Sequence, residues 1–159
     1  DPPMSYLTRT SATLAVLTGL TGPALADPIR TYAAKGSYED VKFELGNAIV
    51  GRGLVIDFTG NLGAMLARTG ADVGSTKPLY KSAEYMTFCS AKLSRDMMEA
   101  DPLNIGLCPY VVFIFESADK PGQVTVGYRR PEARGSATSS KAIAAIDALL
   151  DQIAKDATK

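Results

Sequence analysis

The chain has 159 residues, 46% of them hydrophobic, and its 17 basic and 17 acidic side chains give a formal net charge of zero. This size and composition predict one globular domain with a single core. The charge balance argues against a nucleic-acid-binding protein, which would carry a basic surface. The chain has no histidine, which excludes a Ser-His-Asp triad, a Cys-His pair and histidine-ligated zinc within it.

The first 26 residues have the pattern of a short extension followed by a secretory leader. Residues 1–3 precede the first methionine and are interpreted as a remnant or an extended reading frame; the apolar stretch 14–20 and the small residues 24–26 then resemble a cleavable signal peptide. The apolar stretch is too short to cross a bilayer, which takes about 20 apolar residues. We therefore expect residues 27–159 to form a single mature domain that is periplasmic or secreted. The alternative is an uncleaved leader that holds the chain at a membrane.

Hydrophobic periodicity and turn residues predict five strands and four helices in the mature chain. In chain order we expect a strand at 29–34, a helix capped by Ser37 and stopped at Gly51, a strand at 54–58, a helix between Asn61 and Gly70, a strand at 81–89, a helix at 91–101, strands at 110–115 and 124–128, and a final helix capped by Ser139 or Ser140. The unbroken apolar run 110–115 indicates a central strand or one buried on both faces.

The arrangement of these elements favours an antiparallel sheet, because successive strands are joined by short links. The first and last helices are amphipathic, so each needs a partner layer for its apolar stripe. In the last helix this stripe consists of Ile143, Ile146, Leu150 and Ile153. We predict an α+β two-layer sandwich, with an antiparallel sheet of about five strands packed by two main helices.

Several short segments resemble the family catalogued as domain of unknown function 302. They are residues 88–93, 101–102, 105–111, 124–126 and 130–131. The chain departs from the family pattern at both cysteines: Cys89-Ser90-Ala91 lacks the expected proline, and in Leu107-Cys108-Pro109 the proline follows the cysteine. The resemblance implies a β-α-β(4)-α fold similar to the TATA-binding-protein architecture, and often a homodimer. It implies no settled activity.

Both cysteines flank the predicted helix at 91–101. Cys89 ends one strand and Cys108 begins the next, so antiparallel pairing of these strands would bring the two sulfurs to one end of the sheet. A structural disulfide is the first interpretation, because an exported protein permits it and the pair would close a loop of about 20 residues. A pair of reduced cysteines that only pack is the second.

Two further interpretations give the cysteines a chemical role. Thiolate and thioether ligands suit Cu(I) or haem iron, and Met86, Cys89 and Cys108 form the candidate metal set. Against this set, Met86 faces away from Cys89 on an ideal strand. Thiol redox chemistry is the other possibility, although the chain lacks a Cys-X-X-Cys motif.

A small basic cluster, formed by Arg129, Arg130 and Arg134, is a candidate patch for an anion or an acidic partner, or a solvated strand end. The chain shows no catalytic constellation. We therefore expect an exported, non-catalytic binding or accessory module that acts near the Cys89/Cys108 end of the sheet, with a protein partner or a second copy of itself. The alternatives are a thiol redox or soft-metal protein, with copper or haem as cofactor, and an accessory subunit of a membrane assembly.

Overall fold

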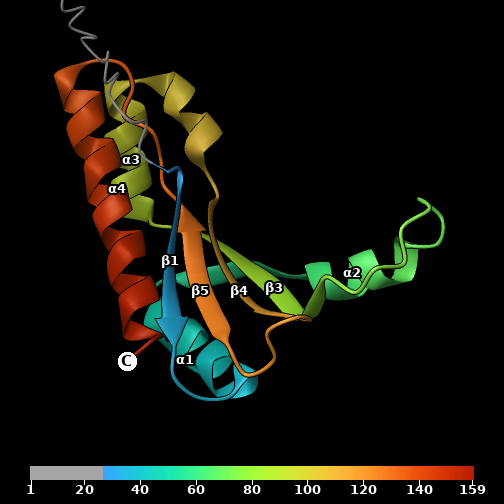
Figure 1. Cartoon of the computed structure of the whole chain (residues 1–159). Coiled ribbons are helices and arrows are strands. Elements are labelled where there is room, and N and C mark those ends of the chain that lie inside the picture. Colours follow the sequence, from blue (N-terminus) through green and yellow to red (C-terminus); the bar gives the residue numbers. More distant parts are fainter. Residues whose placement is uncertain (1–26) are drawn as a thin grey trace, which may run out of the picture.

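The computed structural model describes residues 27–159, so the predicted leader lies outside the described residues. Figure 1 shows the chain from end to end. Its elements are β1 (Ile29–Ala34), α1 (Tyr38–Val50), β2 (Val55–Asn61), α2 (Leu62–Thr69), β3 (Tyr80–Cys89), α3 (Ala91–Ala100), the short 3-10 helix η1 (Pro102–Leu107), β4 (Tyr110–Ser117), β5 (Val124–Arg129) and α4 (Ala137–Asp156).

The five strands form one antiparallel sheet in the order β1-β5-β4-β3-β2. The predicted strands and their antiparallel pairing are therefore confirmed. The apolar run 110–115 predicted either a central strand or a strand buried on both faces. The strand β4 is central, which confirms the first of these predictions, and the second is wrong. Alternate β4 residues, from Tyr110 to Glu116, are buried, and the residues between them are only partly buried.

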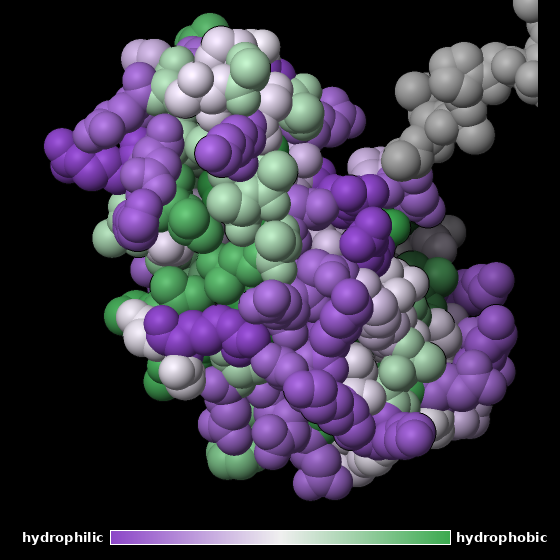
Figure 2. All heavy atoms as spheres, turned by 90° about the vertical axis from the view of Figure 1, so that its left-hand side faces the viewer, coloured by the Kyte–Doolittle hydropathy of each residue, from purple (hydrophilic) through white to green (hydrophobic). Residues whose placement is uncertain are grey.

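The helices α1 and α4 pack on one face of the sheet and α3 packs against α4, which confirms the two-layer α+β architecture (Figure 1). The predicted stripe of α4 is buried throughout, and α1 buries Val41, Leu45 and Ile49 in the same core. The helix α3 also contributes, because Met97 is fully buried and α3 contacts α4. Viewed from the α4 side, most of the surface is hydrophilic, with hydrophobic atoms gathered in one region of its upper half (Figure 2).

Short-range capping places most helix ends where the sequence predicts them. The side chains of Ser37, Asn61 and Ser90 each accept a hydrogen bond from a backbone N–H three residues on. The predicted start of α4 is wrong: Ser136 is the cap, three residues before Ser139. Ser139 is fully buried instead, where its hydroxyl accepts a hydrogen bond from Asn104 of η1.

The helix α2 and the loop after it project from the sheet as an arm, which we define as residues 62–79 (Figure 1). No residue of α2 is buried, and α2 packs mainly against β3. Its first turn does so through Gly63, whose backbone lies close to Ala83. The arm therefore adds almost nothing to the core.

Candidate functional site

Both cysteines lie at one end of the sheet, as their positions at the strand ends predict. Phe88 pairs with Tyr110 across β3 and β4, so Cys89 and Cys108 come just beyond the last rung of this pair. Both are free, partly buried thiols in the structure. The Cys108 side chain and the backbone N–H of Tyr110 are both close enough to Cys89 to shift its pKa. The disulfide itself stays a prediction.

Two hydroxyl groups extend this contact into a chain of four polar side chains, which we call the thiol cluster: Cys89, Cys108, Ser94 and Tyr110. The Ser94 hydroxyl lies 3.4 Å from the Cys108 sulfur and 2.8 Å from the Tyr110 hydroxyl. Ser94 is held there because the Ser90 cap begins α3 directly after Cys89. The tyrosine ring is buried against Phe88 in an edge-on contact.

The surroundings of the thiol cluster favour the protonated forms of the Cys89 thiol and the Tyr110 hydroxyl. Burial raises the pKa of Cys89 to about 11, and the neighbouring Cys108 and Asp57 act in the same direction. Burial likewise raises the pKa of Tyr110 to about 12. Cys89 is thus a thiol, not a thiolate, at neutral pH. It therefore lacks the resting thiolate that makes a cysteine a ready nucleophile or metal ligand.

The structure does not bring Met86 to the thiols, so the predicted set of Met86, Cys89 and Cys108 is not assembled. Met86 is buried on the helix-covered face, beside Lys42 and Phe43 of α1. It is also three residues from Cys89 along β3, or about 10 Å at the rise of a strand. Within residues 27–159, no three His, Cys, Asp or Glu side chains come together to hold a metal ion.

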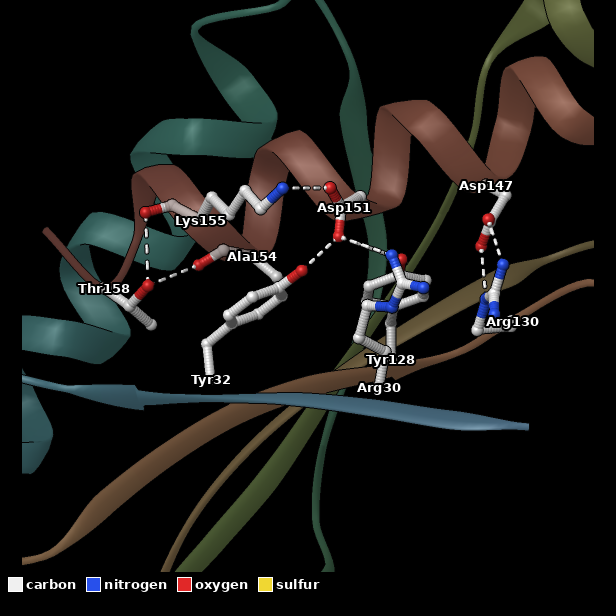
Figure 3. A network of polar contacts seen from close by, with 9 residues as sticks. All are labelled: Arg30, Tyr32, Tyr128, Arg130, Asp147, Asp151, Ala154, Lys155 and Thr158. Carbon is white, nitrogen blue, oxygen red and sulfur yellow. Dashed lines mark hydrogen bonds and ion pairs between the residues drawn. The ribbon is translucent and has the colours of Figure 1, made fainter. Parts of the chain in front are cut away.

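The three arginines do not form one patch either. Arg130 makes a two-pronged ion pair with Asp147 of α4, at 2.9 and 3.2 Å (Figure 3). Arg134 binds Asp101 at 2.9 Å and the side-chain oxygen of Asn104 at 2.6 Å. Arg129 is exposed on the face of the sheet that points away from α1 and α4. Two of the three charges thus tie α4 and η1 to the rest of the fold, and the sequence does not reveal these partners.

A second polar network, missed in the sequence, centres on Asp151 of α4 (Figure 3). Its carboxylate accepts hydrogen bonds from Tyr32, from Arg30 at 3.2 Å, from Tyr128 at 3.3 Å and from Lys155 at 2.6 Å. Three of these donors come from β1 and β5, so the network fastens α4 to the edge of the sheet. The carboxylate is matched by two cations and two tyrosine hydroxyls, which indicates a structural role.

The face of the sheet away from α1, α3 and α4 is more hydrophobic than a solvated face should be. We call it the open face. Near its centre Phe113 lies beside Phe115, with ring centres 6.3 Å apart, and Phe58 lies 6.0 Å from Tyr85. The side chains that alternate onto it from the three strands β2, β3 and β4 are Val55, Phe58, Ala83, Tyr85, Thr87, Val111, Phe113 and Phe115.

A hollow of about 380 Å³ lies beside the thiol cluster. Leu107 and Pro109, the neighbours of Cys108, line it together with Tyr110, Arg129 and Arg130. Two large apolar residues of η1, Leu103 and Ile105, are exposed close by in sequence. This end of the sheet thus combines two thiols with accessible apolar surface.

An open-faced α+β sandwich with a thiol pair at one end is the class of protein that these features define. The sequence model described as "Domain of unknown function DUF302" matches residues 30–158. The chain therefore belongs to the DUF302 family, as the matching segments between residues 88 and 131 predict.

A solved structure agrees with this assignment. The chain is similar to the crystal structure of an uncharacterised conserved DUF302 protein from Bacillus stearothermophilus, with a TM-score of 0.68 and 11% identity. The alignment covers 82% of this chain and 98% of the other. At this identity the likeness shows the fold alone. No curated protein matches the chain.

Proposed function

We propose that this protein is an exported, non-catalytic interaction module whose open face is covered by a protein partner. The observation that carries the proposal is the composition of that face. A sheet covered by helices on one side ordinarily presents polar residues on the other, whereas this face presents four aromatic rings on β2, β3 and β4. Exposed apolar surface of this kind marks an interaction site.

The arm supports the same proposal. An isolated helix of eight residues is not stable in water, because nucleation costs more than so few hydrogen bonds return. α2 has this length and buries no residue. Its Leu62 and Met65 and the following Val73 are exposed apolar side chains. A partner that covers both the open face and the arm would bury them.

The partner that we propose is a second copy of the chain. Two-fold symmetry requires a surface that complements itself. Here Arg129 lies on β5 and Asp57 on β2, at the same end of the open face and toward opposite sides of it. A two-fold axis parallel to the strands would bring Arg129 of each copy toward Asp57 of the other.

A different protein, including a membrane-bound assembly, is the alternative partner. Within residues 27–159 no helix is long and apolar enough to span a bilayer.

The test is the oligomeric state of a Phe58→Glu variant, measured by sedimentation over a range of concentrations. Phe58 is 58% exposed in the single chain, so the change leaves the core intact. We expect the wild-type chain to be dimeric and the variant to dissociate at least tenfold more readily, because each interface would bury two unpaired carboxylates. Phe43→Glu is the matched control, since Phe43 is 67% exposed on α1, away from this face.

Two results would contradict the proposal. A wild-type chain that stays monomeric at high micromolar concentration would eliminate the second copy as the partner. Equal dissociation of the Phe58→Glu and Phe43→Glu variants would show that self-association does not use the open face.

A further inference from the structure

We propose that Cys89 and Cys108 are a redox-active pair, which changes between dithiol and disulfide by exchange with an incoming disulfide. This inference does not depend on the proposed interaction function, because the thiol pair lies within one chain.

The geometry of the strands brings the two sulfurs together without any rearrangement of the sheet. Cys89 is the last residue of β3, and Cys108 comes two residues before β4 begins, both just past the Phe88–Tyr110 rung. The register sets Cys89 opposite Pro109, so the two cysteines are diagonal neighbours across strands about 4.8 Å apart, and a disulfide joins Cα atoms about 4.4–6.8 Å apart. The Cys108 thiol is also close enough to raise the pKa of Cys89. The 18 residues between the cysteines, which include α3 and η1, leave the sheet at the end of β3 and return to it at the start of β4.

The pair is also accessible from outside. Both cysteines are only partly buried. Cys108 sits between Leu107 and Pro109, which line the hollow of about 380 Å³. Both thiols are thus partly open to solvent, although neither of them lines the hollow itself. Because burial raises the pKa of Cys89, we assign the first attack to Cys108 and the closing step to Cys89.

The exchange has two steps. Cys108 loses its proton, and its sulfur attacks one sulfur of the incoming disulfide R–S–S–R. The S–S bond breaks, one RS⁻ leaves, and Cys108 carries a mixed disulfide. Cys89 then loses its proton and attacks the Cys108 sulfur, which expels the second RS⁻ and forms the Cys89–Cys108 bond. The two protons end on the two RSH products. The protein gives up two electrons, and the incoming disulfide takes them.

The second step should depend on pH. Burial raises the pKa of Cys89 to about 11, so only a small fraction is thiolate at neutral pH. The thiolate fraction, and with it the rate of ring closure, should rise roughly tenfold per pH unit from about pH 7 to pH 10.

The experiment incubates the purified full chain with mixtures of reduced and oxidised glutathione and measures its mass and its free thiols. We expect two thiols per chain under reducing conditions and none after oxidation, with a loss of two hydrogen atoms per chain and no added glutathione. Peptide mapping should recover one cross-linked fragment that contains both cysteines. The Cys89→Ser variant should instead stop at the mixed disulfide and gain one glutathione on Cys108. The Cys108→Ser variant should gain glutathione much more slowly.

Three outcomes would overturn the proposal: both thiols persist at every glutathione ratio, the oxidised product is a disulfide between two chains, or wild-type Cys108 accumulates stable mixed disulfide at high pH. Because the wild-type mass and peptide map decide between them, a serine variant that fails to fold leaves the test intact. A monomeric wild-type chain would end the proposal of self-association and leave this one standing.

Discussion

Asp151 shows how single residues hold this fold together. Burial alone would raise the pKa of its carboxyl, but hydrogen bonds from Lys155, Tyr32 and Arg30 outweigh burial and hold the pKa well below its usual range. The ionised carboxylate is therefore bound more tightly in the folded state than in the unfolded chain. Its contribution to stability is present above the unfolded pKa of about 3.9 and is lost as the pH falls toward the folded value.

The first prediction at this scale concerns Asp151→Asn. We expect the free energy of unfolding at pH 7 to fall by about 2 kcal/mol, because an amide loses the charged hydrogen bonds to α4 and to both strands. The loss should shrink as the pH is lowered from 5 to 2, since the Asp151 carboxyl of the unfolded wild-type chain is then protonated while the folded one is still ionised, which lowers the wild-type stability. Urea unfolding at each pH measures both effects.

The control is Asp96→Asn, which removes an exposed ion pair with Lys92 within α3. Such pairs contribute little, so its effect should stay below about 1 kcal/mol. A pH-independent loss in Asp151→Asn would show that the carboxylate charge is not what fastens α4.

At the scale of elements, the sheet depends on a glycine that lies beneath an aromatic ring. Gly127 of β5 pairs with Phe113 of β4, and a Cβ built on it would come 2.4 Å from the Phe113 ring and 2.7 Å from the Arg30 carbonyl oxygen of β1. The ring can turn aside, but the carbonyl belongs to a neighbouring strand. The absence of a side chain thus lets three strands lie close together.

We therefore expect Gly127→Ala to destabilise the fold by about 1–3 kcal/mol, the usual cost of overpacking. Gly46→Ala provides the opposite control, because Gly46 lies within α1 and nothing surrounds its Cβ position. There the exchange should stabilise by about 1 kcal/mol, since alanine is the better helix former. Thermal or urea unfolding of both variants would measure the difference. Similar stabilities for the two would contradict the close approach at Gly127.

For the whole molecule, the central question is whether the arm belongs to the domain or to an interface. Apart from the packing of its first turn on β3, the arm buries only Gly70, which lies against the Ser75 carbonyl of its own loop. Its exposed apolar side chains Leu62, Met65 and Val73 therefore contribute little to the core. A second surface that covers them would account for their position.

The prediction for the whole molecule follows from replacing residues 64–77 by a glycine–serine segment of equal length. We expect the monomer to lose less than about 1 kcal/mol of stability, as for exposed positions in general, and the dimer to weaken at least tenfold. Sedimentation and urea unfolding of the same variant measure the two effects separately. A large loss of monomer stability with unchanged self-association would place the arm in the core.

The sequence by itself determined the elements, the caps of α1 and α2 and the faces of the strands, because these depend on contacts a few residues apart. It also predicted that Cys89 and Cys108 meet, because one strand ends where the next begins. Only the tertiary structure decided that Arg130 and Arg134 are paired and that Ser136 caps α4. Only it revealed Asp151, whose partner Arg30 is 121 residues away in the chain. Periodicity tells which way a side chain points, whereas the order of strands and the docking of α4 decide what it meets there.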